Sequence, residues 1–411
     1  MRPSLSFTNK TDWNSYFIHE LCDILTGYPF EGNTIKSKGR NALMRGINIT
    51  EGYIRHSKDI DRFFDGDTTS LSKYRLNLND LVISMDGSKV GKNSALVTDK
   101  ETGALLVQRV ARLRSTDIDT IQLLLQLFGS NRFFKYVDNI KTSSAIPHIS
   151  LADIKQFVVA LPTDEHEKNL LSSFCKLLRE HTTLAQAQLY KLQQIKLACL
   201  QSMFPQEGES VPKVRFKGFN EEWRTKRLSD CLLVSHDKNI DNIYNVNDVL
   251  SVSDDYGVKN QIELLGRSYA GKSVSKYGIL YKDEIVFTKS PLKTKPFGIL
   301  KMNTYKTGIV SVLYAIYKAN KNISPLYIHY YFDPAWRLNK YLSPLVNKGA
   351  KNTMNISDEY ALSGEIMIPS FQEQQKIASY FENLDKQISL QTQRLEKLKQ
   401  IKSACLDKMF V

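Results

Sequence analysis

The sequence has few features of a membrane, secreted or metal-binding protein. None of its 411 residues belongs to a run of about 18 apolar residues, so we expect no membrane-spanning helix. The first 17 residues, MRPSLSFTNKTDWNSYF, have neither an apolar core nor a cleavage signature, so we expect no secretory signal. The five cysteines contain no CxxC pair, and the seven histidines do not cluster at ligand spacings. We therefore expect reduced thiols in a cytoplasmic protein that binds no metal.

Catalytic motifs are also scarce. GRSYAGKS (Gly266–Ser273) matches the phosphate-binding loop pattern G-x-x-x-x-G-K-[ST], which requires a buried strand before it and a helix after it. The following segment reads as a strand instead. FDPAW (Phe332–Trp336) lacks the second proline of amino-methyltransferase motifs, and Asp153-Ile-Lys155 lacks an acidic partner for a nuclease centre. We expect no catalytic residue and no cofactor on this chain. A nucleotide-dependent DNA-acting enzyme that uses Gly266–Ser273 remains an alternative.

Positive charge is abundant and evenly distributed. The formal net charge is +13 and the isoelectric point about 9.2. Residues 1–205 contain 26 basic and 21 acidic residues, a net charge of +5, and the remainder contains 30 and 22, a net charge of +8. Both halves are basic, which suits two surfaces that face one polyanion.

The sequence also repeats itself. KLQQIKLACLQSMF (Lys191–Phe204) returns as KLKQIKSACLDKMF (Lys397–Phe410), with ten of fourteen positions identical at an offset of 206 residues. Upstream, Ser143–Pro162 matches Lys351–Pro369, and the motifs PSLSF and PKVRF precede a tryptophan in both halves. The segments between these anchors cannot be aligned. The chain is therefore a tandem of two units with shared ends, individual middles and a shared helix.

The repeated helices have an apolar seam whose steps alternate between four and three residues. The seam residues that we expect to pack together or to dock a partner are Phe174, Leu192, Ile195 and Cys199 in the first copy and Phe381, Leu384, Ile388, Leu395 and Leu398 in the second. Because each copy can cover the seam of the other, we predict one intramolecular antiparallel coiled coil. About 30 helical residues would form a rod of roughly 45 Å, longer than one turn of duplex DNA. The alternative is that each helix packs only on its own domain.

The middles read as mixed α/β, an α+β arrangement of short strands and helices. The expected strands are Leu81–Met85, Ala104–Leu113, Glu284–Thr288 and Ile309–Tyr317, and the expected helices are Ile118–Phe128 and Pro325–Phe332. The predicted order is a globular domain in residues 1–160, a spacer helix in 161–206, a second globular domain in 207–368 and a second spacer helix in 369–411.

Several loops between these elements combine lysine with glycine, asparagine and serine. Lysines in such loops can bind phosphates, and their polar neighbours can read base edges. The expected DNA-contacting residues are Lys36, Lys38, Arg40, Lys89 and Lys92 in the first domain and Lys272, Lys289, Lys293, Lys295, Lys348 and Lys351 in the second. The competing interpretations are solvated loop charges on each of these residues, and a coiled-coil adaptor that joins two proteins without nucleic acid.

Taken in order, these motifs resemble the specificity (S) subunits of type I restriction-modification enzymes over essentially the whole chain. The resemblance rests on the P-x-[LV]-x-F…W unit starts, on IPHISLADIKQFVVALP, and on the helix IPSFQEQQKIASYFENLDKQISLQTQRLEKLKQIKSACLDKMF. In the first copy, LPTDEHEKNLLSSF departs from the usual acidic-Gln-Gln pattern.

The resemblance implies that each middle is a target-recognition domain that reads one half of a bipartite, asymmetric site in double-stranded DNA. It implies two modification (methyltransferase) subunits that bind S-adenosylmethionine and methylate adenine. It also implies restriction (translocase/nuclease) subunits that use ATP and magnesium. The chain itself would be a non-catalytic subunit whose coiled coil sets the spacer and holds the complex together.

Overall fold

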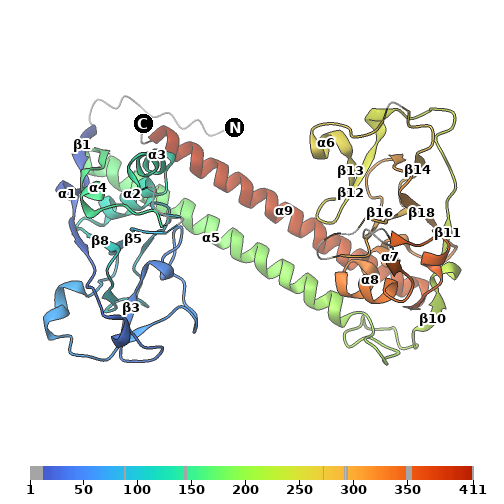
Figure 1. The fold of residues 1–411 in the computed structure, drawn as a ribbon, viewed down its shortest axis with the longest axis horizontal. Helices are drawn as coiled ribbons and strands as arrows, with labels where there is room; N and C mark the ends of the chain where they lie inside the picture. The colour runs from blue at the N-terminus through green and yellow to red at the C-terminus, as the bar shows by residue number, and fades with distance from the viewer. Residues whose placement is uncertain are drawn as a thin grey trace. The chain divides into compact units, whose positions relative to one another are not determined.

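The structure is a computed structural model that describes residues 13–87, 89–142, 146–271, 273–290, 292, 295–348 and 354–409 (Figure 1). It divides into two compact units. Unit 1 contains Met1–Ala187 and Thr392–Val411, and unit 2 contains Gln188–Gln391. No helix in the described part of the chain is long and apolar enough to cross a membrane.

Unit 1 is built from short strands and helices. Its strands are β1 (Trp13–Phe17), β2 (Asp23–Thr26), β3 (Asn41–Met44), β4 (Phe63–Phe64), β5 (Leu81–Ser84), β6 (Ser94–Leu96), β7 (Leu105–Leu106), β8 (Val110–Arg114) and β9 (Val158–Pro162). Its helices are α1 (Ile18–Leu21), α2 (Ile118–Phe128), α3 (Asn131–Ile140) and α4 (Leu151–Gln156), with 3₁₀ turns at Gly32–Thr34, Gly46–Asn48 and Thr69–Tyr74. The first part of α5 (Glu165–Ser202) and the last part of α9 (Phe371–Met409) complete the unit.

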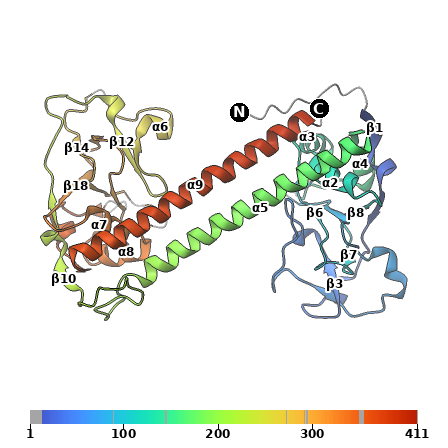
Figure 2. The ribbon, with the colours of Figure 1, turned by 180° about the vertical axis from the view of Figure 1, so that it is seen from behind.

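A four-stranded antiparallel sheet with the order β2-β8-β5-β6 organises unit 1. Side chains alternate along β5: Leu81 and Ile83 pack with the helices, whereas Val82 packs on the other face with Met44 and Leu106. Figures 1 and 2 show α2 and α4 beside this sheet, with β3 on the side away from them. Because helices cover one face and the small sheet β4-β3-β7 covers the other, β5 is buried on both faces.

Unit 2 contains a second set of short elements. Its strands are β10 (Arg224–Arg227), β11 (Leu232–Val234), β12 (Leu250–Ser253), β13 (Gly257–Asn260), β14 (Gly278–Leu280), β15 (Ile285–Thr288), β16 (Ile299–Met302), β17 (Gly308–Val310), β18 (Tyr314–Ala319), β19 (Asn347–Lys348), β20 (Met354–Asn355) and β21 (Glu365–Ile368). Its helices are α6 (Gln261–Leu265), α7 (Pro325–Phe332) and α8 (Ala335–Leu342), with 3₁₀ turns at Leu228–Asp230, Val246–Asp248 and Tyr360–Leu362.

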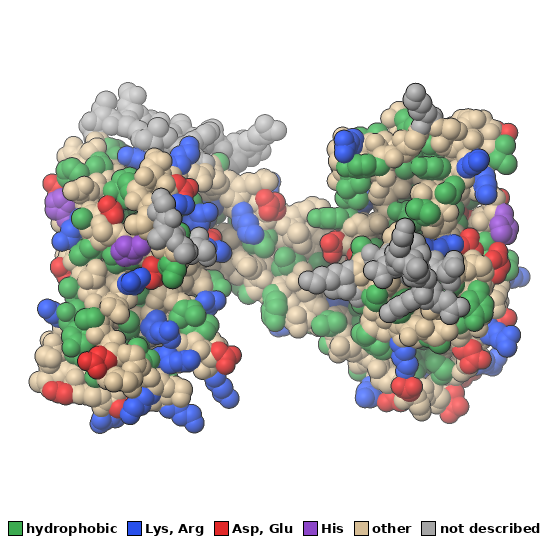
Figure 3. All heavy atoms as spheres, in the orientation of Figure 1, with side chains coloured by type: hydrophobic (Ala, Val, Ile, Leu, Met, Phe, Trp, Pro, Cys, Tyr) green, Lys and Arg blue, Asp and Glu red, His purple; other side chains and the backbone are tan. Residues whose placement is uncertain are grey.

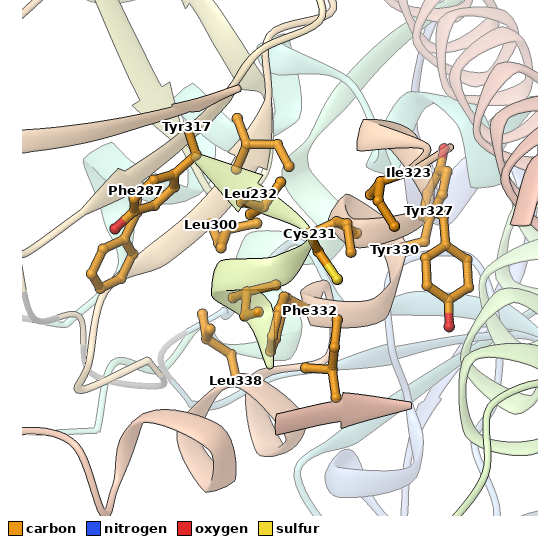
Figure 4. Close-up of a cluster of buried hydrophobic side chains, with 14 of the residues drawn as sticks. Cys231, Leu232, Phe287, Leu300, Tyr317, Ile323, Tyr327, Tyr330, Phe332 and Leu338 are labelled. Carbon is orange, nitrogen blue, oxygen red and sulfur yellow. The ribbon is translucent and has the colours of Figure 1, made fainter. Parts of the chain in front are cut away.

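The central sheet of unit 2 repeats the topology of unit 1. Its order, β11-β18-β15-β16, matches β2-β8-β5-β6 strand for strand. Ile285 and Phe287 belong to the core cluster that contains the helices, and Figure 4 shows part of this cluster, including Phe287. Val286 belongs to the cluster on the other face of the sheet. The peripheral pairs β1–β9 and β10–β21 are also equivalent. This confirms the expected tandem of two mixed α/β units, even though the middles share no alignable sequence.

The two long helices lie antiparallel within each unit. In unit 2, Gln391 Nε2 donates to Gln188 Oε1 over 3.0 Å, and the rings of Phe204 and Phe381 stack 6.0 Å apart. In unit 1, Cys175 of α5 and Cys405 of α9 belong to the same buried cluster. The helices contain 38 and 39 residues, more than the 30 or so that the sequence predicts. Each is about 57 Å long.

Candidate nucleic-acid interface

One hairpin loop occupies the same position in both units. Residues 85–93 join β5 to β6, and residues 289–298 join β15 to β16. Five of the lysines with expected DNA contacts lie on these two loops: Lys89 and Lys92 on the first, and Lys289, Lys293 and Lys295 on the second. Since both loops leave a buried strand, the sheet holds their ends at a defined place in each unit.

In unit 1 the hairpin presents its lysines to solvent. Gly87 has a φ of +100°, and its N–H donates to the carbonyl of Pro147 over 3.0 Å, which fixes the start of the loop. Lys89 Nζ lies 3.3 Å from Glu51 Oε1, and both side chains are more than half exposed. Lys92 Nζ lies 5.0 Å from the centroid of the Phe134 ring. Surface contacts of this kind are weak, so both ammonium groups can exchange them for phosphates.

The same hairpin has an arginine neighbour that sequence analysis missed. Arg109 adopts a φ of +65°, and its carbonyl accepts a hydrogen bond from Met85 N–H over 2.9 Å. Its Nη1 lies 3.4 Å from Asp86 Oδ2, and its side chain is mostly exposed. The sequence ALLVQRVARL was interpreted as one strand. The left-handed backbone at Arg109 instead divides it into β7 and β8 and leaves a guanidinium beside the loop.

A second basic segment of unit 1 contains Lys36, Lys38 and Arg40, all exposed. Lys36 exchanges two backbone hydrogen bonds with Phe63, of 2.9 and 2.8 Å. The backbone N–H of Arg40 donates to Asp65 Oδ1 over 2.7 Å, and its Nη2 donates to the carbonyl of Asp65 over 3.2 Å. Within the described residues, no hydrogen bond or ion pair joins this segment to the hairpin. It is therefore a separate basic surface held by β4.

In unit 2 the two described hairpin lysines are paired with acids. Lys289 Nζ lies 2.5 Å from Asp358 Oδ1, with a quarter of its side chain exposed. Lys295 is buried: its Nζ lies 2.5 Å from Asp254 Oδ1 and donates to the carbonyl of Asp333 over 3.0 Å. The expected DNA contact at Lys295 is therefore corrected, because its ammonium group is occupied inside the unit.

The side chains of four further residues with expected DNA contacts are not described by the structure. Lys272, Lys293 and Lys351 lie outside the described residues, and Lys348 is described only by its backbone in β19. The loop around Lys272 can be judged from its flanks. Gly266 ends α6 in a left-handed conformation with a φ of +78°, and β14 follows. A helix thus precedes this loop and a strand follows it, the reverse of the order that a phosphate-binding loop requires.

Unit 2 also has a basic and aromatic surface that sequence analysis missed. The Nζ atoms of Lys259 and Lys306 lie 5.6 and 5.4 Å from the centroid of the Tyr305 ring. The Tyr305 hydroxyl donates to both carboxylate oxygens of Glu263, and this hydrogen bond raises the pKa of Tyr305. Figure 3 shows Lys and Arg side chains dispersed among other types on the visible face. Tyr305 is half-buried, and aromatic rings flanked by cations are typical of nucleic-acid surfaces, although no spacing in the sequence reveals this group.

Most of the expected seam residues are buried or half-buried. Phe381, Leu384 and Leu395 are buried, Phe174, Leu192, Cys199, Ile388 and Leu398 are half-buried, and Ile195 is 37% exposed. A different set of apolar residues on α5 faces solvent. Leu170, Leu177 and Leu184 in unit 1 are all more than half exposed. Their seven-residue spacing places them on one helix face, which sequence analysis missed because it followed the buried seam.

The chain is similar to proteins of known type. A model of the family described as the type I restriction modification DNA specificity domain matches residues 10–194 and 220–400. The type I restriction enzyme EcoAI specificity subunit of Escherichia coli is 24% identical over 169 residues. That match covers 41% of this chain and 28% of the relative, so the chain matches less than a third of the relative's length.

One solved structure shares the fold. The type I restriction-modification system S subunit from M. genitalium has a TM-score of 0.64 with 13% sequence identity, covering 100% of this chain and 99% of its own. The HsdS subunit from Thermoanaerobacter tengcongensis covers 98% of both chains at 16% identity, with a TM-score of 0.40 that is too low to carry an argument. The first similarity establishes the two-unit fold.

Proposed function

Because the chain belongs to the family of type I restriction-modification DNA specificity domains, we propose that each unit reads one half of a bipartite, asymmetric DNA site. One observation carries this proposal. Both units place a hairpin loop at the same point of the same sheet, yet the loop sequences are unrelated. A shared support with an individual loop is the arrangement expected when two domains perform the same task on different sequences.

In this proposal, a set of lysines and arginines supplies affinity and a few side chains supply discrimination. Lys36, Lys38, Arg40 and the hairpin pair Lys89 and Lys92 bind phosphates in unit 1. Lys289, with Lys272, Lys293, Lys348 and Lys351, binds phosphates in unit 2. Neutralising phosphates releases counterions, so affinity falls steeply as salt rises. Arg109, which stands beside the first hairpin, is a candidate for bidentate contact with a guanine in the major groove.

We further propose that the α5/α9 pair sets the spacer between the half-sites and docks the partner subunits. The partners are two modification (methyltransferase) subunits and the restriction (translocase/nuclease) subunits, in the cytoplasm. S-adenosylmethionine, ATP and magnesium would bind to these partners, and this chain would be a non-catalytic part of their complex. The exposed Leu170, Leu177 and Leu184 support docking, because a heptad row of leucines suits a partner helix.

Methylome sequencing tests the proposal. A host that expresses this chain with its modification subunit is compared with a host that lacks only this chain. We expect a bipartite methyladenine motif that appears only when the chain is present. If no new motif appears and the purified complex binds DNA without salt dependence or not at all, the proposal is wrong and a protein–protein adaptor is favoured.

Shortening both helices by one heptad is expected to shorten the spacer. The deletions remove residues 185–191 from α5 and 388–394 from α9, and are centred on the paired Gln188 and Gln391. Seven helical residues span about 10 Å, or about three base pairs, so the methylated motif should keep both half-sites and lose about three spacer base pairs. Tyr190→Ala preserves helix length and is the control, with an unchanged spacer expected. An unchanged spacer in the deletion variant would refute the role of the helices as a ruler.

A further inference from the structure

A series of partly buried ion pairs starts at the β15–β16 hairpin of unit 2. Lys295, in the hairpin, and Lys301, in β16, are both about 5% exposed. The Nζ of Lys295 lies 2.5 Å from Asp254 Oδ1, and the Nζ of Lys301 lies 3.4 Å from the same oxygen. Lys301 Nζ also lies 2.8 Å from Asp333 Oδ1, at the turn between α7 and α8. The hairpin is thereby tied to the helical layer of its own unit.

The series continues into the long helices. Asp333 Oδ2 lies 3.2 Å from the Nζ of Lys196 in α5, and the same Nζ lies 2.8 Å from Asp385 Oδ1 in α9. The Tyr330 hydroxyl donates to Asp385 Oδ2 over 3.0 Å and closes this end. All of these residues belong to unit 2. Six charged side chains therefore link the hairpin to both helices without an interruption.

The pairing overcomes the cost of burying these charges. Burial alone would raise the pKa of Asp333 and lower that of Lys196, because each charged form loses hydration. The net effects are opposite: the ammonium groups of Lys301 and Lys196 lower the pKa of Asp333, and the carboxylates of Asp333 and Asp385 raise that of Lys196. Each group is thus held in its charged form, and the loss of one partner would leave another buried charge unpaired.

The sequence repeat supplies an internal comparison. Lys402 occupies the same repeat position as Lys196, 206 residues further along the chain. In unit 1 its neighbour across the helix pair is the cation Arg179, and burial together with Arg179 lowers the pKa of Lys402. No carboxylate forms an ion pair with Lys402 among the described residues. At the hairpin of unit 1, Lys89 forms only an exposed, weak pair with Glu51, and Glu51 acts on Lys402 through its charge alone. Among the described residues, a continuous series of close ion pairs from hairpin to helices therefore occurs in unit 2 and not in unit 1.

We propose that this ion-pair series positions the β15–β16 hairpin for DNA reading, so that Lys196 and Asp333 govern discrimination of one half-site without touching DNA. The inference rests on the proposed function of unit 2. A loop of ten residues loses much conformational entropy when it binds, and a loop that is already anchored at one residue loses less. Lys196 and Asp333 are positioning residues in this scheme, and the hairpin makes the contact.

The test uses the complete complex with its modification subunits and duplexes that carry the motif from the methylome. Dissociation constants are measured by fluorescence anisotropy for the cognate duplex and for duplexes with either half-site scrambled. Lys196→Met is expected to reduce discrimination of the half-site read by unit 2 by about tenfold, the equivalent of one good base contact. Discrimination of the other half-site and the salt slope should stay unchanged, because no phosphate contact is removed.

Two control variants and a second test variant separate a positioning role from general damage to the complex. Lys196→Arg keeps the charge and should restore most of the discrimination. Lys402→Met removes the repeat-equivalent lysine and should leave both half-sites unaffected. If Lys196→Met does not yield a folded complex, Asp254→Asn breaks the series at its hairpin end. Lys301 remains paired with Asp333 in this variant, which should show the same selective loss of discrimination.

The outcomes distinguish the inference from the function on which it rests. A wild-type complex that ignores both scrambled half-sites overturns the proposed function, and the inference falls with it. A normal wild-type complex with unchanged discrimination in Lys196→Met and Asp254→Asn overturns the inference alone. Equal loss at both half-sites also overturns it, because damage to the whole complex has no preference between units.

Discussion

Replacing Phe204 with alanine is expected to destabilise unit 2 by about 3–5 kcal/mol, the usual cost of truncating a fully buried aromatic side chain. Phe204 lies just beyond the end of α5 and is completely buried. Its ring lies 6.2 Å from that of Trp223, 5.7 Å from Tyr327 and 6.0 Å from Phe381. The guanidinium of Arg337 lies 4.6 Å from its centroid. One side chain therefore joins the β10 region, α7, α8 and α9.

Hydrogen exchange is the suitable measurement, because a chain with two units need not unfold in one step. Protection should fall in α7 and β15 of unit 2 and remain in α2 and β5 of unit 1. Tyr190→Ala, on the exposed face of the same helix, is the matched control and should change stability by less than about 0.5 kcal/mol. If Phe204→Ala were as mild as this control, the role of Phe204 in joining these elements would be refuted.

Asp333→Asn should be the next most damaging change, at about 3 kcal/mol in unit 2. The substitution keeps the volume of the side chain but removes the carboxylate shared by Lys196 and Lys301. This loss of stability is at the lower end of the range for breaking a buried ion pair, because Lys196 remains paired with Asp385 and Lys301 remains paired with Asp254. Asp241→Asn, on the surface, is the control. Equal stability of the two variants in denaturant unfolding would contradict a structural role for the ion pairs.

The same variant should change how stability depends on pH. The pKa of Asp333 is lower in the folded chain than in the unfolded chain, so its contribution is complete above about pH 4 and is lost as pH falls further. Wild type and Asp333→Asn should therefore differ most at neutral pH and converge in acid. His329, whose pKa burial lowers to about 3 against the opposing effect of the Asp333 carboxylate, weakens both proteins below about pH 6.5, since only the unfolded chain takes up its proton there. A gap that stayed constant down to pH 2 would contradict this account.

The long-range organisation was predictable because it is periodic. The 206-residue repeat, the antiparallel helices, and the helices at Ile118–Phe128 and Pro325–Phe332 all follow from spacing. The shared sheet order of the two units was not predictable. Strands such as LVIS in β5 and IVFT in β15 need only a few apolar residues in any order. Many sequences satisfy that requirement, so the two units can share a topology although their middle sequences cannot be aligned.

Individual charges were harder to place than elements. Lys295 reads as an ordinary loop lysine, and nothing in the sequence indicates that Asp254, 41 residues earlier, lies beside it. One missed element did carry a signal. In the segment after IPHIS, for which no helix was predicted, Ser150 and Asp153 form a capping box that starts α4. The four-residue pattern Ser-x-x-Asp could have shown the helix.

The division of the chain has a consequence for its synthesis. Unit 2 is one continuous stretch, whereas unit 1 needs residues 392–411 to return to a core begun more than two hundred residues earlier. Cys405 and Leu406 fill part of that core. On the ribosome, unit 2 can therefore fold as soon as it emerges, while the domain that is translated first must wait for the segment translated last. A premature stop near residue 391 would leave the later domain whole and expose the earlier one.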